Sequence, residues 1–146
     1  MTRVDFHFNV PDKVDYGCRL VRKAFRAGHR MVVFSDDATL LARFDQSLWT
    51  FSAQDFIPHV MATDPLASET AVLLTQSELQ DAGHAGDRDL MVNLGSLTPP
   101  GFARFERLIE LVSGLDEDRA AGRARWRFYR DRGYPIETHD LAGAGQ

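Results

Sequence analysis

The stretch RMVVFSDDATLLARFDQSL, residues 30–48, decides the fold. Its first six residues form a short apolar run, which is typical of a strand covered on both faces of a parallel sheet. Asp36 and Asp37 follow, and after them come apolar residues at helical spacing: Leu40, Leu41, Phe44 and Leu48. A buried strand followed directly by an amphipathic helix is half of a βαβ unit, so this stretch predicts a parallel sheet.

The rest of the chain repeats the alternation of strands and helices. The predicted strands cover residues 4–10, 30–35, 70–75, 89–94 and 107–112, with an edge strand after residue 136. Residues 107–112 could instead end the short helix that precedes them, and we favour the strand. The predicted helices cover 14–25, 38–48 and 116–132, with a short one after Pro99 and Pro100, while 48–59 reads as irregular. We therefore expect one α/β domain over residues 1–140, with a mostly parallel sheet and helices on both faces, Rossmann-like but without a nucleotide-binding motif. Residues 141–146 are expected to be a flexible C-terminal tail.

Composition excludes several classes of protein. A chain of 146 residues predicts one domain that can bury a core without disulfides. The single cysteine, Cys18, lies in a helical pattern, which favours a buried thiol over a reactive one. The first ten residues, MTRVDFHFNV, lack the apolar segment of a signal peptide, and no apolar run is long enough to span a membrane. We expect a cytoplasmic protein with no membrane partner.

Catalytic motifs are absent from the sequence. It contains no GxxxxGK[ST], GxGxxG or GxSxG pattern. Asp36 and Asp37 are the sharpest catalytic candidates, because two carboxylates after a buried strand can hold Mg²⁺ for phosphoryl chemistry. The simpler interpretation, which we favour, is a helix cap that stabilises the helix by about 1 kcal/mol. The five histidines show no i, i+4 pair, so we predict no metal, no cofactor and no enzyme activity.

The second informative stretch is RARWRFYRDRGY, residues 123–134, which holds five arginines and four aromatic residues. At 100° per residue, Arg123, Arg127 and Arg130 line one face of the predicted helix, with Trp126 and Tyr129 on or beside it. Two further sets are predicted: Ala121, Ala124 and Phe128 against the sheet, and Arg125 and Arg132 on the flank.

Three interpretations of this helix are open. It is a solvated amphipathic helix, or it binds single-stranded nucleic acid through stacking and phosphate contacts, or it captures an acidic, partly apolar peptide end. Residues 119–134 carry six arginines and one acid, a net charge of +5, which leaves −9 for the rest of the chain. A long nucleic acid would extend onto repelling surface, whereas a short peptide would not, so the charge distribution favours the peptide.

Two motifs together carry a family resemblance. FDQSLWTFSAQDFIPH (44–59) and GRARWRFYRDRGY (122–134) resemble the chi subunit of bacterial DNA polymerase III, an accessory of the clamp loader. The chain length, the order of elements and the N-terminal FHF strand agree as well, so the resemblance covers nearly the whole chain.

The resemblance implies a non-catalytic adaptor in DNA replication, associated with the replisome. Such a subunit pairs with the psi subunit of the clamp loader and grips the acidic C-terminal tail of the single-stranded-DNA-binding protein, which ends in Pro-Phe, so that DNA is engaged only indirectly. The tail site that it implies consists of Arg123, Trp126, Arg127, Tyr129, Arg130 and Val112, with Trp49 and Phe56 expected beside the helix. The psi-binding residues stay unassigned, and the alternative function is direct binding of single-stranded nucleic acid by the same helix.

Overall fold

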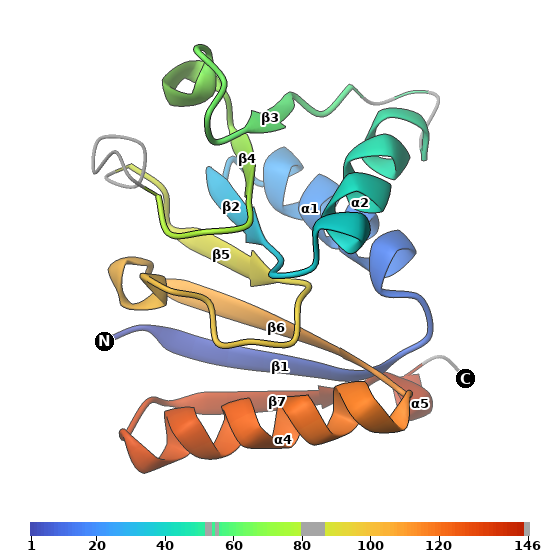
Figure 1. Ribbon diagram of the computed structural model, residues 1–146, viewed down its shortest axis with the longest axis vertical. Coiled ribbons are helices and arrows are strands. Elements are labelled where there is room, and N and C mark those ends of the chain that lie inside the picture. The colour runs from blue at the N-terminus through green and yellow to red at the C-terminus, as the bar shows by residue number, and fades with distance from the viewer. Residues whose placement is uncertain (52–53, 55, 80–86, 145–146) are drawn as a thin grey trace.

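A seven-stranded sheet organises the structure, a computed structural model that describes residues 1–51, 54, 56–79 and 87–144 (Figure 1). The strand order is β3-β4-β2-β5-β6-β1-β7, and every described pair is parallel. The strands are β1 (Arg3–Val10), β2 (Met31–Phe34), β3 (His59–Met61), β4 (Val72–Thr75), β5 (Leu90–Asn93), β6 (Arg107–Ser113) and β7 (Ile136–Asp140). The predicted α/β class with a parallel sheet is confirmed.

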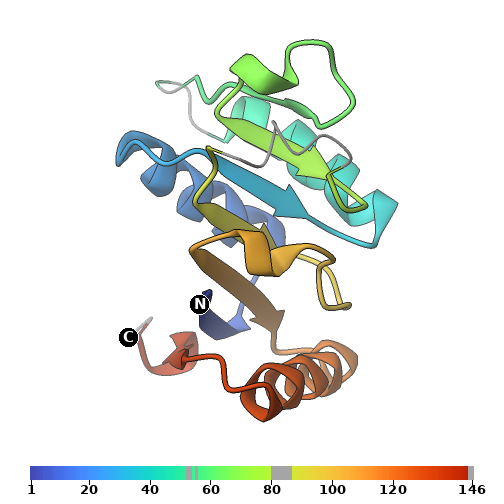
Figure 2. The same ribbon diagram turned by 90° about the vertical axis from the view of Figure 1, so that its left-hand side faces the viewer.

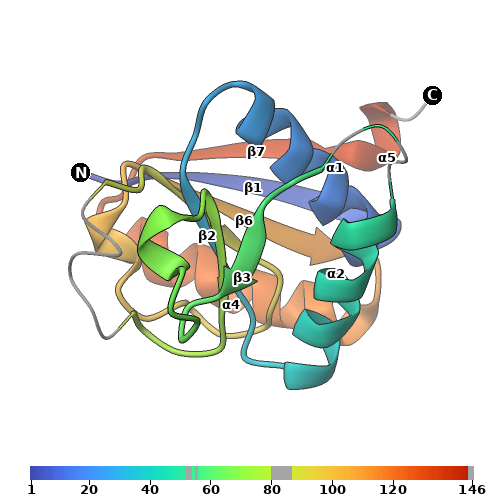
Figure 3. The same cartoon turned by 90° about the horizontal axis from the view of Figure 1, so that it is seen from above.

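Helices cover both faces of the sheet. They are α1 (Lys13–Arg26), α2 (Ala38–Thr50), α4 (Asp116–Asp131) and the short α5 (Leu141–Ala144), with 3₁₀ turns η1 (Ala67–Glu69) and η2 (Phe102–Arg104). Helices α1 and α2 lie side by side on one face (Figure 3). Helix α4 packs on the other face, at the end of the sheet where β6, β1 and β7 lie (Figure 2). Neighbouring strand residues such as Val32 and Val33 point to opposite faces and enter different cores.

Aspartates begin the first two helices. Asp12 caps α1 by accepting hydrogen bonds from the backbone N–H groups of Val14 and Asp15. Asp37 caps α2 in the same way, at 2.9 Å from the nitrogen of Thr39. The capping interpretation of Asp37 is therefore confirmed, because its carboxylate is engaged by the helix N-terminus.

Helix α4 packs on the sheet through a different face from the predicted one. Gly122, Arg125 and Tyr129 are buried, whereas Ala124 is exposed and Phe128 is half-buried. The predicted packing stripe is wrong for Ala124, whereas Ala121 is half-buried and Phe128 packs partly against the core. The placement of Arg125 on the flank is wrong. The prediction assumed that the apolar residues face the sheet.

Two contacts between α4 and β6 explain why the helix packs through this face. Gly122 lets the helix approach closely, since a Cβ atom there would lie 2.9 Å from Cγ2 of Val112. Arg125 is drawn inward by Glu110, a carboxylate on the same strand, to which its Nε donates at 2.9 Å. An arginine can therefore occupy the core when the sheet supplies a buried partner.

Glu110 is the centre of a buried polar network under α4. It accepts hydrogen bonds from the Tyr129 hydroxyl at 2.6 Å and from Nδ2 of Asn93 at 2.9 Å, besides that from Arg125. Burial raises the pKa of the Glu110 carboxyl, and the charge of Arg125 opposes that rise. Burial and the neighbouring Glu110 also raise the pKa of Tyr129 far above its usual value, so the phenol stays a donor.

The C-terminal segment forms the predicted edge strand, β7, beside β1. The chain then continues into α5, and residues 145–146 lie outside the described residues, so flexibility of 141–146 stays a prediction. The segment predicted as irregular ends in β3, a short strand at the opposite edge, and most of the predicted polar loop 78–88 lies outside the described residues. Within the described residues no helix has the length and apolar character needed to cross a bilayer.

Candidate functional site: a pocket between α4 and the sheet

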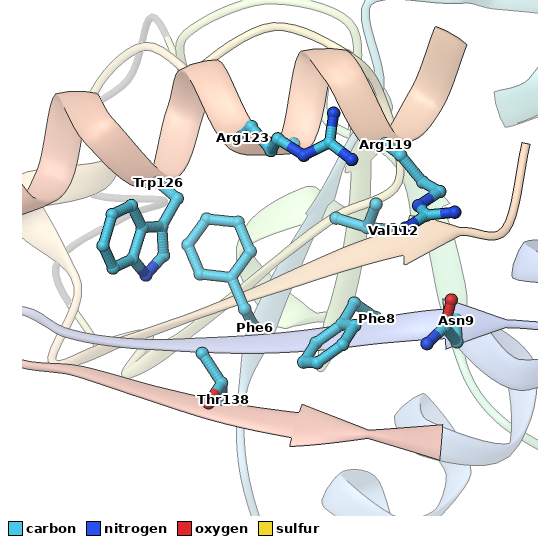
Figure 4. Close-up of a pocket in the computed structure, with 9 residues that line it drawn as sticks. Phe6, Phe8, Asn9, Val112, Arg119, Arg123, Trp126 and Thr138 are labelled. Carbon is cyan, nitrogen blue, oxygen red and sulfur yellow. The ribbon is translucent and has the colours of Figure 1, made fainter. Parts of the chain in front are cut away.

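A pocket of about 250 Å³ lies between α4 and the end of the sheet that β1 and β7 form (Figure 4). It is lined by Phe6, Phe8 and Asn9 of β1, Val112 of β6, Thr138 of β7, and Arg119, Gly122, Arg123 and Trp126 of α4. These lining residues include no carboxylate, imidazole or thiol.

The walls of the pocket are mainly apolar. Phe6 and Phe8 project from the same face of β1 because they lie two residues apart on a strand (Figure 4). Trp126 projects towards them from α4 and is half-buried. Gly122 of α4 and Val112 of β6 also line the pocket, where the helix backbone approaches the strand closely.

The mouth of the pocket carries positive charge. Arg119 and Arg123 lie one turn apart on α4, and both side chains are exposed and directed towards the pocket (Figure 4). Neither forms an ion pair with any described residue. Two unpaired guanidinium groups one turn apart suit an anionic ligand, above all a carboxylate, which they bind in a bidentate manner.

Arg130 supports the indole of Trp126. Its guanidinium carbon lies 4.9 Å from the centre of the Trp126 ring, a cation–π contact. The same guanidinium pairs with Asp131 at 3.0 Å. The charge of Arg130 is thus partly neutralised, and one face of the indole is covered.

Asn9 shapes the end of the pocket. Its φ of 59° places it in the left-handed region, which asparagine adopts more readily than most residues. The pairing of β1 with β6 shifts register between His7 and Val10, so Asn9 lies in a bulge. Its Nδ2 donates to Asp140 at the end of β7, 2.8 Å away. This hydrogen bond joins β1 to β7 at that end of the pocket.

The sequence matches one protein family, both as a family and through individual relatives. The model described as "DNA polymerase III chi subunit, HolC" matches residues 1–137. The chain belongs to this family. The subunit chi of Pseudomonas aeruginosa is 35% identical over 97% of this chain and 98% of its own length. The subunits chi of Escherichia coli and Haemophilus influenzae are 22% and 23% identical over 83% and 87% of this chain. The chi family places the chain in DNA replication, among the subunits of DNA polymerase III.

Three of the predicted site residues of this chi-family chain meet in the pocket: Arg123, Trp126 and Val112. Arg127 is exposed but does not line the pocket, and Arg130 reaches it only through Trp126. Tyr129 does not belong to the pocket lining, because its ring is fully buried beneath α4 and its hydroxyl is bonded to Glu110. Its predicted place on the exposed face with the arginines is wrong.

Trp49 and Phe56 lie elsewhere on the chi-family fold. Their rings pack together with centroids 5.6 Å apart, at the end of α2 and just before β3. Helix α2 covers the face opposite to α4, and β3 is the edge strand opposite to β7. The expectation that they lie beside α4 is therefore wrong, since the sequence does not reveal to which edge of the sheet the segment 44–59 returns. Trp49 is 50% and Phe56 67% exposed, so they form a separate apolar surface.

Asp36, which with Asp37 was the candidate Mg²⁺ site, is hydrogen-bonded to Ser96 and Leu97 in the loop after β5. Burial acts to raise its pKa, but hydrogen bonds from the backbone N–H groups of Leu97 and Ser96 outweigh burial and lower it. With Asp37 at the helix cap, both carboxylates stabilise local structure. A metal is not needed to account for either of them.

Sequence reasoning missed several pocket residues in this chi-family chain: Phe6, Phe8, Asn9, Arg119, Gly122 and Thr138. Arg119 could have been predicted from helical spacing, because it lies four residues before Arg123 and seven before Trp126 and so shares their face of the helix. Phe6 and Phe8 share a face of a predicted strand, but their position opposite α4 follows only from the strand order. Thr138 needed the pairing of β7 with β1, which no local pattern indicates.

Proposed function

We propose that this chain is a non-catalytic adaptor of the DNA polymerase III holoenzyme. In this proposal it links the clamp loader, through the psi subunit, to the single-stranded-DNA-binding protein in the cytoplasm, and it does so by binding the acidic C-terminal tail of that protein. The observation that carries the proposal is the apolar pocket with the unpaired Arg119 and Arg123 at its mouth.

The pocket fits the end of a peptide better than a cofactor. Its volume of about 250 Å³ is below the roughly 300–1,000 Å³ of sites for drug-sized ligands. One aromatic side chain can occupy the space between Phe6, Phe8 and Trp126, while Arg123 and Arg119 bind the terminal carboxylate. Preceding acidic residues of the tail would then lie along α4, within reach of Arg127.

An adaptor needs a second surface for its other partner. The exposed pair of Trp49 and Phe56 is the apolar surface that we assign to psi in this proposal. It lies on the opposite face and at the opposite edge of the sheet from the pocket. Both partners could therefore bind at the same time. Contiguous exposed apolar surface of this kind marks protein interaction sites.

The rival function, direct binding of single-stranded nucleic acid, is less well supported. Tyr129 is buried and so offers no stacking surface, and Arg130 already covers one face of Trp126. Base stacking on aromatic side chains is the main attraction in that binding mode. The acidic remainder of the chain also repels an extended polyanion.

The test is a titration of a labelled acidic nonapeptide ending in Pro-Phe, followed by fluorescence anisotropy. A short peptide buries little area, so we expect a dissociation constant on the order of micromolar. Several tails on one oligomeric partner would then raise the effective affinity through avidity. We expect affinity to be lost when the peptide carries a C-terminal amide or lacks the final Phe, because each change removes one of the two recognised groups.

Arg43→Ala is the matched control for Arg123→Ala, since Arg43 is another exposed arginine without an ion pair among the described residues, on α2. We expect Arg123→Ala to weaken binding by about 1–3 kcal/mol and Arg43→Ala to leave it unchanged. Equal affinity for the carboxylate and amide peptides would refute the proposal. Salt-dependent binding of bare oligonucleotide that Arg123→Ala abolishes, with no binding of the peptide, would support the rival function instead.

A further inference from the structure

A second polar cluster lies on the face of β1 and β7 that points away from α4. Asp5 is the register partner of Glu137, and His7 is the register partner of His139. Residues two apart on a strand share a face, so these four side chains project from one patch. Nothing in the proposed adaptor function uses them.

Asp5 is the most unusual member of the cluster. Its side chain is 1% exposed, and one carboxylate oxygen pairs with Nε of Arg107. The other oxygen, Oδ1, is buried and has no hydrogen-bond partner among the described residues. A buried carboxylate oxygen without a donor is unfavourable, and a bound cation is one way to satisfy it.

The neighbours of Asp5 supply further metal ligands. Asp5, Glu137 and His139 each offer a ligand atom, and these atoms lie within 4.8 Å of one another. The ligand atoms around a tetrahedral zinc ion lie roughly 3.4 Å apart, given bonds of about 2.0–2.2 Å. Glu137 and His139 are exposed, so a rotation of their side chains can close the remaining distance.

We propose that Asp5, Glu137 and His139 form a Zn²⁺ site that joins β1 to the edge strand β7. One imidazole nitrogen and two carboxylate oxygens are ordinary zinc ligands, and the fourth position is open to water or to His7. The ring centroid of His7 lies 4.7 Å from that of His139. Its Nδ1 is hydrogen-bonded to the Tyr16 hydroxyl at 2.5 Å, while its Nε2 is buried and finds no hydrogen-bond partner in the part of the chain that the structure describes. An imidazole oriented through its second nitrogen is the usual arrangement at zinc centres.

Access and charge set the expected strength of binding. A cavity of about 370 Å³, lined in part by His7, His139 and Arg107, opens beside the cluster and provides a path for the ion. The two carboxylates give a charge of −2, which the neighbouring Arg107 reduces to −1. The site therefore attracts a dication, but less strongly than a structural zinc centre built from thiolates.

The experiment uses the untagged chain after removal of metals with a chelator. We expect Zn²⁺ titration by calorimetry to give one ion per chain and Co²⁺ to produce visible absorption bands on binding at the same site. Zinc should also raise the thermal midpoint, because it binds only the folded arrangement of β1 and β7.

His139→Ala and Glu137→Gln are the decisive variants, since both side chains are exposed and their loss leaves the core intact. Each should weaken zinc binding by roughly tenfold or more and leave the midpoint of the metal-free chain unchanged. The control is His29→Ala, which removes another imidazole that lines the same cavity but pairs with Asp89. The proposal is overturned if the wild type binds no stoichiometric zinc, if His139→Ala binds it as tightly as the wild type, or if His29→Ala loses as much affinity as His139→Ala.

Discussion

Arg125 of α4 and Glu110 of β6 form an ion pair at 2.9 Å whose side chains are 3% and 0% exposed. Together with the close approach of Gly122 to Val112, this pair orients α4 on the sheet. With Arg125 turned into the sheet, Arg119, Arg123 and Trp126 lie on the side of the helix that faces β1 and the pocket. A buried contact outside the pocket thus helps to determine which arginines line the pocket.

Arg125→Met should therefore destabilise the protein strongly. Removing one partner of a buried pair leaves the other charge uncompensated, which costs about 3–5 kcal/mol. Denaturant unfolding checks this, with Arg127→Met as the control because Arg127 is exposed and makes no ion pair with a described residue. Equal stabilities of the two variants would show that the pair does not hold α4 in place.

The structure separates two arginines that the family resemblance treats alike. Arg123 lines the pocket and Arg127 does not. We expect Arg123→Ala to weaken binding of the acidic peptide by about 1–3 kcal/mol. For Arg127→Ala we expect a loss below about 1 kcal/mol, as for an exposed charge. A larger effect at position 127 would mean that the peptide lies along the outside of α4.

Gly122 and Val112 should show coupled effects on stability. Because a Cβ atom at 122 would lie 2.9 Å from Cγ2 of Val112, Gly122→Ala should push α4 away from β6 and cost about 1–3 kcal/mol. Val112→Ala alone leaves a cavity, but in combination with Gly122→Ala it makes room for the new methyl group. A double-mutant cycle measured by thermal unfolding tests this coupling. Additive losses would mean that the two residues do not limit the approach of the helix.

Cys18 should resist thiol reagents in the folded protein. Its side chain is inaccessible, and burial, with smaller contributions from Asp15 and Asp12, raises the pKa of the thiol to about 12. At pH 8 only about one thiol in ten thousand would be ionised, and the thiolate is the reactive form. Ellman's reagent should therefore react only when urea unfolds the chain. Rapid modification under native conditions would show that α1 opens readily from the sheet.

The sequence was informative where local pattern determines structure. The run at 30–35, the aspartate cap at 37 and the helical spacing from 38 to 48 each predict what the structure contains, β2 followed by α2. Asp37 is an example, because its capping of α2 depends only on the backbone of the next three residues. The parallel sheet then follows, because successive βα units leave few other arrangements.

The pocket could be predicted only in part, because its geometry depends on contacts between distant segments. Arg123 and Trp126 were found from composition, spacing and family resemblance. The burial of Arg125 and Tyr129 was missed because both depend on Glu110, a charged residue inside a predicted strand that gives no local sign of its partners. Trp49 and Phe56 were placed on the wrong side because strand order decides their position.

The pairing of β7 with β1 makes the pocket depend on two distant parts of the chain. Residues 136–140 supply Thr138 and the strand that pairs with the one carrying Phe6 and Phe8. A chain truncated before residue 136 would keep α4 but lose one wall of the pocket. Deletion of this strand would therefore disrupt the pocket without removing any of its arginines.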